Sequence, residues 1–306
     1  MLALWTFTGF DFSPGSRIHP GLEDAPGFRF PADSLPAGVY FRSFSDASLH
    51  AAIGHNGFLW GEIRGQGWWY YYFVNALYKV PLGMFLLAVI ALGRPRFARV
   101  EIGLIIPIAG YVAFCIASTV AIGFRHALPL EILCFIGIGR IMQRAVIVRR
   151  AAWVITAITL INIALWHPNY LSFINAPRER VWMQISDSNL DWGQGLKQVR
   201  NWIESKRASR DNRSVSLIYF GSPDVLNGYR GLPDELNDDV HIGLPDSMSG
   251  WLITTPIAVS RQYADPVLPV GFQSLKPTEM IGDSLLVFDL DDPKVRAAIE
   301  ESPERE

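Results

Sequence analysis

The sequence lacks the short motifs that are typical of many enzyme active sites. We find no glycine-rich phosphate loop, no Cys/His spacing of the kind that holds a metal, and no G-x-S-x-G nucleophile element. Cysteine is scarce as well. The two cysteines, Cys115 and Cys134, both fall in apolar segments, so we expect packed thiols rather than a disulfide. We therefore expect neither a metal nor a cofactor.

Long apolar runs are what the chain has instead. They cover residues 80–93, 102–122, 127–139 and 151–166. A helix needs roughly 20 mostly apolar residues to cross the hydrocarbon core of a bilayer. The second run reaches that length alone and holds no ionisable side chain, whereas the others need flanking residues. A large soluble helical core is the alternative, but its helices usually carry a polar face, which these runs lack. We predict a polytopic α-helical membrane protein with about four transmembrane helices.

The basic residues predict how these helices are oriented. They gather in the connections after the first and third runs: Arg94, Arg96 and Arg99, then Arg140, Arg144, Arg149 and Arg150. Connections rich in Lys and Arg stay cytoplasmic. We therefore expect an inner (plasma) membrane protein in three parts: the end of a truncated helix plus an extracytoplasmic loop at 1–79, a transmembrane helix bundle at 80–167, and an extracytoplasmic α/β domain at 168–306. Nucleic acid is not an expected partner, because that last part is acidic and the basic clusters face cytoplasmic headgroups.

Residues 168–306 have the pattern of a folded α/β domain. Helices are predicted at 196–206 and 293–301, and strands at 214–220, 250–256 and 284–290. Asp187, Asn189 and Asp191 have the spacing of a calcium loop, but such a loop also needs a glutamate at its twelfth position, where Gln198 stands. We interpret the cluster as a structural turn that docks the domain on the membrane helices.

Glycine and aromatic residues alternate through residues 54–72, just before the first run. One interpretation is an interfacial aromatic belt, since Trp and Tyr favour the headgroup level of a bilayer. The other is a substrate-facing loop in which His55, Glu62 and Arg64 are the polar groups. The two interpretations are compatible.

Three segments resemble one family of membrane enzymes. They read GHNGFLWGEIRGQGWWYYYFVNALYKVP at 54–81, GFRHALP at 123–129 and PNYLSFINAPRERVWMQISDSNLDWGQGLKQVRNWI at 168–203. In this order they are similar to segments of the bacterial phospholipid-carrier-dependent glycosyltransferases, members of the GT-C superfamily that are related to the protein O-mannosyltransferases. The resemblance implies transfer of a sugar from a polyprenyl-phosphate carrier outside the membrane.

The family's catalytic carboxylate lies in the first external loop, upstream of the segments that match. Here the chain opens with an apolar stretch at 2–10, about 14 Å long as a helix and too short to cross a bilayer. Asp11 follows this stretch and is not expected to be catalytic, so we assign no catalytic residue. We expect the C-terminal part of such an enzyme, with the other half supplied by the same gene or by a partner chain. The alternative is a non-catalytic membrane module that binds a lipid carrier or scaffolds an envelope complex.

The resemblance also implies a site for the phosphate of the lipid-linked sugar. Arg125 and His126 lie at the predicted outer end of the third helix, and Lys79 lies at a similar depth. A guanidinium can hold phosphate oxygens through two parallel hydrogen bonds. The alternative is that these cations extend to the membrane interface without a ligand. Glu131, one turn deeper, is expected to pair with Arg125 or His126.

Overall fold

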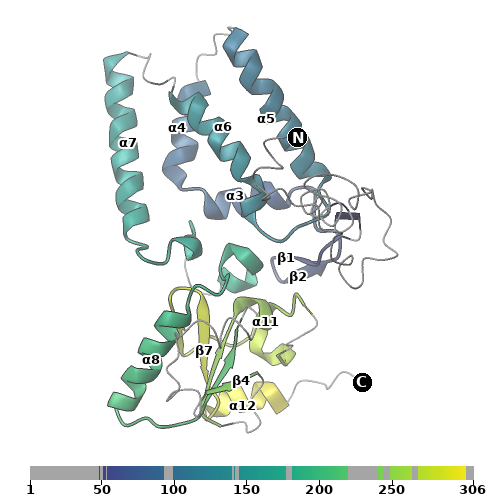
Figure 1. Ribbon diagram of the computed structural model, residues 1–306, viewed down its shortest axis with the longest axis vertical. Coiled ribbons are helices and arrows are strands. Elements are labelled where there is room, and N and C mark those ends of the chain that lie inside the picture. The colour runs from purple at the N-terminus through teal and green to yellow at the C-terminus, as the bar shows by residue number, and fades with distance from the viewer. Residues whose placement is uncertain are drawn as a thin grey trace, which may run out of the picture.

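The computed structural model describes residues 48, 51–52, 54–92, 99–139, 141, 145–176, 181–219, 240–243, 249–263 and 268–300. These residues form a group of apolar helices and a mixed α/β domain, which lie one above the other in Figure 1. Several residues that the sequence singled out lie outside the described residues: Asp11, Arg94, Arg96, Arg140 and Arg144.

The helical part is formed by the apolar runs. It comprises α3 (Tyr71–Lys79), α4 (Leu82–Leu92), α5 (Arg99–Ala117), α6 (Leu128–Gly139) and α7 (Val146–Ala164). α4 packs against α6 and α7, and α5 packs against α6. α3 crosses the ends of these helices nearest the α/β domain (Figure 1). Large apolar side chains cover the outside of the group, among them Val89, Ile106, Ile147 and Ile161, each more than 60% exposed.

The four predicted spans are established only in part. Among the described residues, α7 alone is long and apolar enough to cross a membrane, and just 11% of its most apolar stretch is buried. α3 and α4 pass the same test as a pair, with a bend of 109° between them. α6 has 12 residues and the apolar part of α5 runs over Ile105–Ala117, so both fall short of the roughly 20 residues required. The structure thus has one or two candidate spans, and four remain a prediction.

The bend between α3 and α4 has a local cause. Val80 ends α3 with an extended backbone (φ −85°, ψ 124°) and is followed by Pro81. A residue before proline is sterically driven out of the helical region, so a helix cannot continue through this position. The first apolar run would need residues of α3 to reach the length of a span, but α3 turns away from α4 at this position.

A short antiparallel hairpin precedes α3. It consists of β1 (Gly57–Leu59) and β2 (Glu62–Arg64). Its turn residues, Trp60 and Gly61, both have positive φ values, of 53° and 83°. β1 is buried and β2 is exposed, so the hairpin lies with one strand against the rest of the protein.

The α/β domain is a five-stranded sheet in the order β4-β3-β5-β7-β6. Its strands are β3 (Val215–Ile218), β4 (Val240–Ile242), β5 (Trp251–Thr254), β6 (Glu279–Ile281) and β7 (Leu285–Asp289). β3 is parallel to β4 and β5, whereas β7 is antiparallel to β5 and β6. The predicted strands at 214–220, 250–256 and 284–290 are confirmed as β3, β5 and β7.

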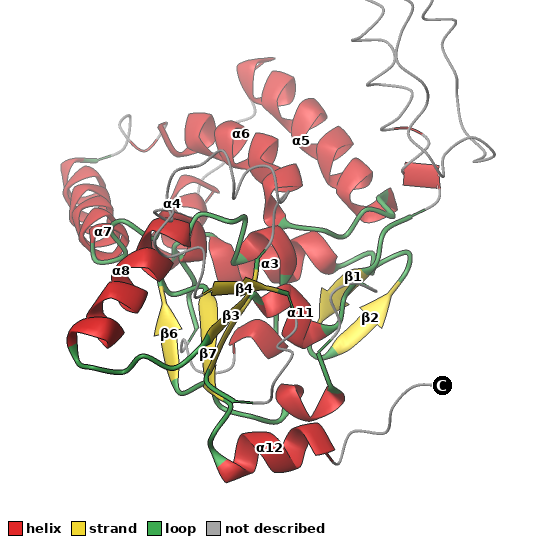
Figure 2. Ribbon diagram, turned by 60° about the horizontal axis from the view of Figure 1, so that its bottom comes forward, coloured by secondary structure: helices red, strands yellow, loops and turns green. Residues whose placement is uncertain are grey.

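Helices cover both faces of this sheet. Along each strand, alternate residues face opposite sides. α8 (Leu196–Ala208) packs on the face that presents Leu217, Ile253 and Val287. The opposite face presents Leu252, Leu286 and Phe288 to α11 (Pro256–Ser260), η7 (Val270–Gln273) and α12 (Pro293–Glu300). In Figure 2, α8 and α11 lie on opposite sides of the strands. The predicted helices at 196–206 and 293–301 are confirmed as α8 and α12.

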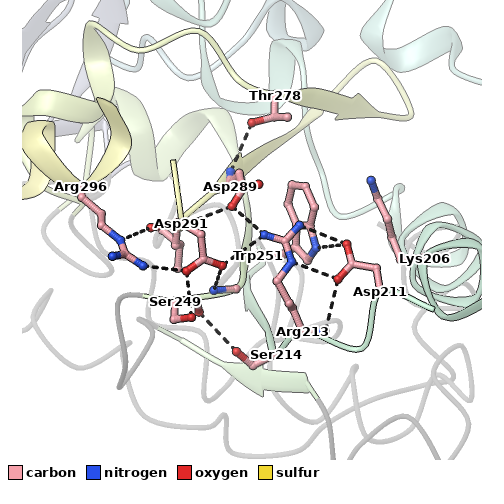
Figure 3. A network of polar contacts seen from close by, with 12 residues as sticks. Lys206, Asp211, Arg213, Ser214, Ser249, Trp251, Thr278, Asp289, Asp291 and Arg296 are labelled. Atoms are coloured by element: carbon pink, nitrogen blue, oxygen red, sulfur yellow. Dashed lines mark hydrogen bonds and ion pairs between the residues drawn. The ribbon is translucent and has the colours of Figure 1, made fainter. Parts of the chain in front are cut away.

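A charged cluster fastens one end of the sheet (Figure 3). Arg213, just before β3, lies 3.0 Å from Asp211, 2.9 Å from Asp289 and 3.2 Å from Asp291. Its guanidinium also lies 4.2 Å from the ring centre of Trp251. These contacts tie the start of β3 to the end of β7, and hydrogen bonding to Arg213 holds the pKa of Asp211 at about 2.

Candidate functional site

The predicted site residues lie where the apolar helices contact the α/β domain. Three short 3-10 helices meet there: η2 (Phe124–Ala127), η4 (Tyr170–Ser172) and η6 (Asp187–Asn189). They come from the second and third segments that carry the family resemblance. A continuous buried core joins the two parts through this region, from Tyr71 and Phe124 to Phe272 and Phe288.

Lys79 connects these segments through hydrogen bonds. Its ammonium group donates to the carbonyl oxygens of Leu171 (2.7 Å), Phe173 (2.7 Å) and Asn189 (2.6 Å). Nearby, the side chain of Asn175 donates to the carbonyl of Leu77 at 2.9 Å, at the end of α3. An ammonium has three N–H donors, so all those of Lys79 are directed at the backbone. The role of Lys79 as a phosphate ligand stays a prediction, and in this structure the residue links α3 to η4 and η6.

Asp187 lies at the centre of a second, buried network. It has a positive φ of 62°, and its carboxylate accepts hydrogen bonds from Gln262 Nε2 (2.9 Å), from the hydroxyl of Tyr263, and from the backbone N–H of Ser188 (2.5 Å). Burial raises the pKa of Asp187, and the hydrogen bond from Tyr263 acts in the opposite direction. The positive charge of Arg125 also lowers this pKa, so the guanidinium lies within electrostatic range of the carboxylate.

His55 joins this network, whereas the other two residues of the predicted substrate loop do not. His55 Nδ1 lies 3.3 Å from the hydroxyl of Tyr263. Glu62 and Arg64 form an ion pair with each other at 3.0 Å, with both side chains more than half exposed. The Arg64 guanidinium lies 5.1 Å from the ring centre of Trp68. The structure therefore brings His55 toward Asp187 and leaves Glu62 and Arg64 as a surface pair on β2.

Arg125 and His126 are held at the junction by η6. The amide oxygen of Asn189 accepts from the backbone N–H of Phe124 at 2.8 Å, and Ser188 Oγ donates to the carbonyl of Ile122 at 2.7 Å. Arg125 and His126 lie next to each other, with Arg125 Nε 3.4 Å from His126 Nε2. Burial and the charge of Arg125 both lower the pKa of His126.

The motif Asp-Ser-Asn-x-Asp-Trp-Gly-Gln, residues 187–194, begins in η6 and continues into a loop with internal hydrogen bonds. Trp192 is 48% exposed, and the guanidinium of Arg125 lies 4.1 Å from its ring centre. Asp191 beside it is fully buried, and one carboxylate oxygen accepts from the backbone N–H of Gly193 at 3.2 Å. The other oxygen has no hydrogen-bond partner among the described residues. Burial raises the pKa of Asp191 to about 6.

An apolar cavity of about 180 Å³ opens between α3, α4, α5 and α6. Its lining includes Val80, Met84, Phe124, Ala127, Leu130 and Glu131. Phe124 and Ala127 are the first and last residues of η2, so Arg125 and His126 lie between two residues that line the cavity. The expected ion pair between Glu131 and Arg125 or His126 is not present in the structure, and Glu131 instead lines the apolar cavity.

A larger cavity, of about 690 Å³, lies in the α/β domain beside the charged cluster of Figure 3. Lys206 and Arg213 contribute to its lining. Lys206 pairs with Glu279 at 2.5 Å, and Arg213 is bound by three carboxylates. These cations are therefore engaged within the domain, and we assign the cluster a structural role.

Sequence reasoning found part of this site. The docking turn predicted around Asp187, Asn189 and Asp191 is confirmed in part. Asn189 and its neighbour Ser188 contact Lys79, Phe124 and Ile122, whereas the carboxylates of Asp187 and Asp191 accept hydrogen bonds from other residues. Tyr263 was missed, since it lies 76 residues from Asp187 and belongs to no recognisable motif. Comparison with protein-family models, with characterised proteins and with solved structures finds no match to this chain.

Proposed function

We propose that this protein is a membrane-embedded part of a glycosyltransferase that uses a polyprenyl-phosphate-linked sugar, and that the junction around η2 binds the lipid carrier. The observation that carries the proposal is the apolar cavity of about 180 Å³ whose lining residues Phe124 and Ala127 flank Arg125 and His126. A prenyl chain needs an apolar channel, and its phosphate needs a charged donor at the channel mouth.

The placement in a membrane is supported by the outer surface of the helices. Val89, Ile106 and Ile147 are 67%, 67% and 74% exposed. A soluble protein rarely presents large contiguous apolar surfaces to water, whereas a bilayer favours them. We assign the helices to the inner membrane and the α/β domain to the extracytoplasmic side, as the basic connections predict.

α3 and the hairpin support an interfacial position for the junction. Phe73 and Leu77 are four residues apart in α3 and are 39% and 59% exposed, and Trp69, two residues before the helix, is 65% exposed. Residues four apart lie on one face of a helix, so Phe73 and Leu77 present an exposed apolar face of α3. Because α3 is bent by 109° from α4, it lies nearly parallel to the membrane if α4 crosses it. A helix in this orientation with an exposed apolar face is typical of the headgroup region.

A second candidate function is a lipid-carrier-binding module without transferase activity. The observation that favours it is the state of the carboxylates near Arg125. Asp187 is bound by Gln262, Tyr263 and Ser188, and Asp191 is fully buried. Neither presents an open oxygen to a substrate in the described junction, and a module that only binds the carrier needs no such oxygen.

Binding of polyprenyl phosphate to the protein in nanodiscs tests the proposal. Arg125→Ala removes a charge-assisted contact worth about 1.5–3 kcal/mol, so we expect affinity to fall roughly ten- to hundredfold. Arg125→Lys keeps the charge without the planar fork and should bind with intermediate affinity. Arg64→Ala, which removes an exposed arginine of the hairpin, is the matched control and should bind as the wild type does. Equal affinities across the four proteins would make Arg125 a membrane anchor and refute the site.

A further inference from the structure

The loop after η6 presents a tryptophan beside the candidate phosphate ligand. Trp192 is 48% exposed while its indole also stacks on Arg125, whose guanidinium is 4.1 Å from the ring centre. The backbone N–H of Trp192 donates to Gln194 Oε1 at 2.7 Å, and that of Gly193 donates to Asp191 at 3.2 Å. Side chains of the same loop therefore hold the backbone that carries the indole, and Arg125 contacts the ring itself, which lowers the entropic cost of binding.

An exposed indole beside a guanidinium matches the chemistry of a glycosyl phosphate. The face of an aromatic ring carries partial negative charge and attracts the C–H groups that line one side of a sugar ring. The guanidinium is suited to the phosphate oxygens. In a glycosyl phosphate the sugar is one ester linkage from the phosphorus, so a phosphate held by Arg125 brings the sugar next to Trp192.

We infer that Trp192 is the platform on which the sugar of the lipid-linked donor stacks while Arg125 holds the phosphate. The inference rests on the proposed function and adds to it the residue that distinguishes a glycosylated carrier from a bare one. If the contact between Arg125 and Trp192 were only structural, the protein would bind the glycosylated and the bare carrier with equal affinity.

The test compares two probes, polyprenyl phosphate and polyprenyl-phosphate-mannose, on the full chain in nanodiscs. The measured quantity is the ratio of their affinities. For the wild type we expect the mannosylated lipid to bind roughly three- to tenfold more tightly than polyprenyl phosphate, because one aromatic stacking contact contributes a free energy of that size. Trp192→Leu should reduce the ratio to one. Trp192→Phe keeps an aromatic face and should retain most of the ratio, while Arg125→Lys should weaken both lipids and leave the ratio unchanged.

The possible failures are distinguishable. If Trp192→Leu keeps the wild-type ratio while Arg125→Lys weakens both lipids, the platform is refuted and the carrier site stands. If Trp192→Leu weakens both lipids equally, the tryptophan only positions Arg125, and the inference fails. If the wild type binds neither lipid, the proposed function fails as well. Trp69→Leu, which removes another exposed tryptophan, is the matched control and should leave the ratio unchanged.

Discussion

Replacing Lys79 by methionine separates its two possible roles. In the structure its three donors bind the carbonyls of Leu171, Phe173 and Asn189. Phe173 and Asn189 are buried, so their carbonyls lose a donor that water cannot readily replace. A buried acceptor left without a partner costs about 1–3 kcal/mol, so the two together cost roughly 2–6 kcal/mol.

Thermal unfolding in detergent measures this loss. We expect Lys79→Met to lower the unfolding midpoint by roughly 5–10 °C, because each kcal/mol shifts the midpoint of a large domain by a few degrees. Lys197→Met, at an exposed position of α8, removes a lysine without such contacts and should unfold as the wild type does. The reasoning is refuted if Lys79→Met keeps the wild-type midpoint and instead loses binding of polyprenyl phosphate. That result would make Lys79 a lipid ligand, as the sequence analysis predicted.

Three further predictions concern electrostatics, membrane contact and topology. Burial raises the pKa of Asp191 from 3.8 to about 6, so the folded state loses stability as pH rises between these values. Asp191→Asn should therefore raise stability above pH 6 by about 2–3 kcal/mol and flatten this dependence, as unfolding midpoints across pH would show; an unchanged midpoint would mean that the carboxylate is solvated. With Cys115 and Cys134 replaced by alanine, nitroxide labels at Phe73 and Leu77 should collide more often with oxygen than with a polar nickel chelate, and a label at Lys197 should show the reverse. Equal chelate access at all three positions would place α3 in water. An alkaline phosphatase fused after Glu306 should be active and a green fluorescent protein dark, whereas the opposite pattern would overturn the orientation.

Local patterns predicted the elements of the α/β domain whose signals extend over several residues. α8 shows an apolar stripe formed by Leu196, Val199 and Ile203, and these residues are buried against the sheet as expected. β4 and β6 were missed because each has three residues, which is too few to show a period of two. The same limit hides the hairpin of β1 and β2.

The junction could be predicted only in outline, because its contacts join distant parts of the chain. The motif around Asp187 identified a docking turn, but nothing local indicated that Lys79 would bind the carbonyl of Asn189, 110 residues away. Tyr263 and Gln262 bind Asp187 from 76 and 75 residues away. The apolar runs predicted helices correctly. Hydropathy alone would join α3 and α4 into one continuous span, but Pro81 ends α3, and the two helices form a bent pair instead.

Photo-crosslinking with a polyprenyl phosphate that carries a diazirine near its head tests the central claim most directly. After irradiation of the protein in native-like membranes, mass spectrometry of the peptides locates the adducts. If the cavity beside η2 binds the carrier, the adducts concentrate on Val80, Met84 and Leu130, and unlabelled polyprenyl phosphate competes for them. The claim is contradicted if the adducts spread over the exposed face of α7, at residues such as Ile147 and Ile158, and unlabelled lipid does not compete for them. That result would show that the carrier contacts this protein only non-specifically, as any membrane lipid does.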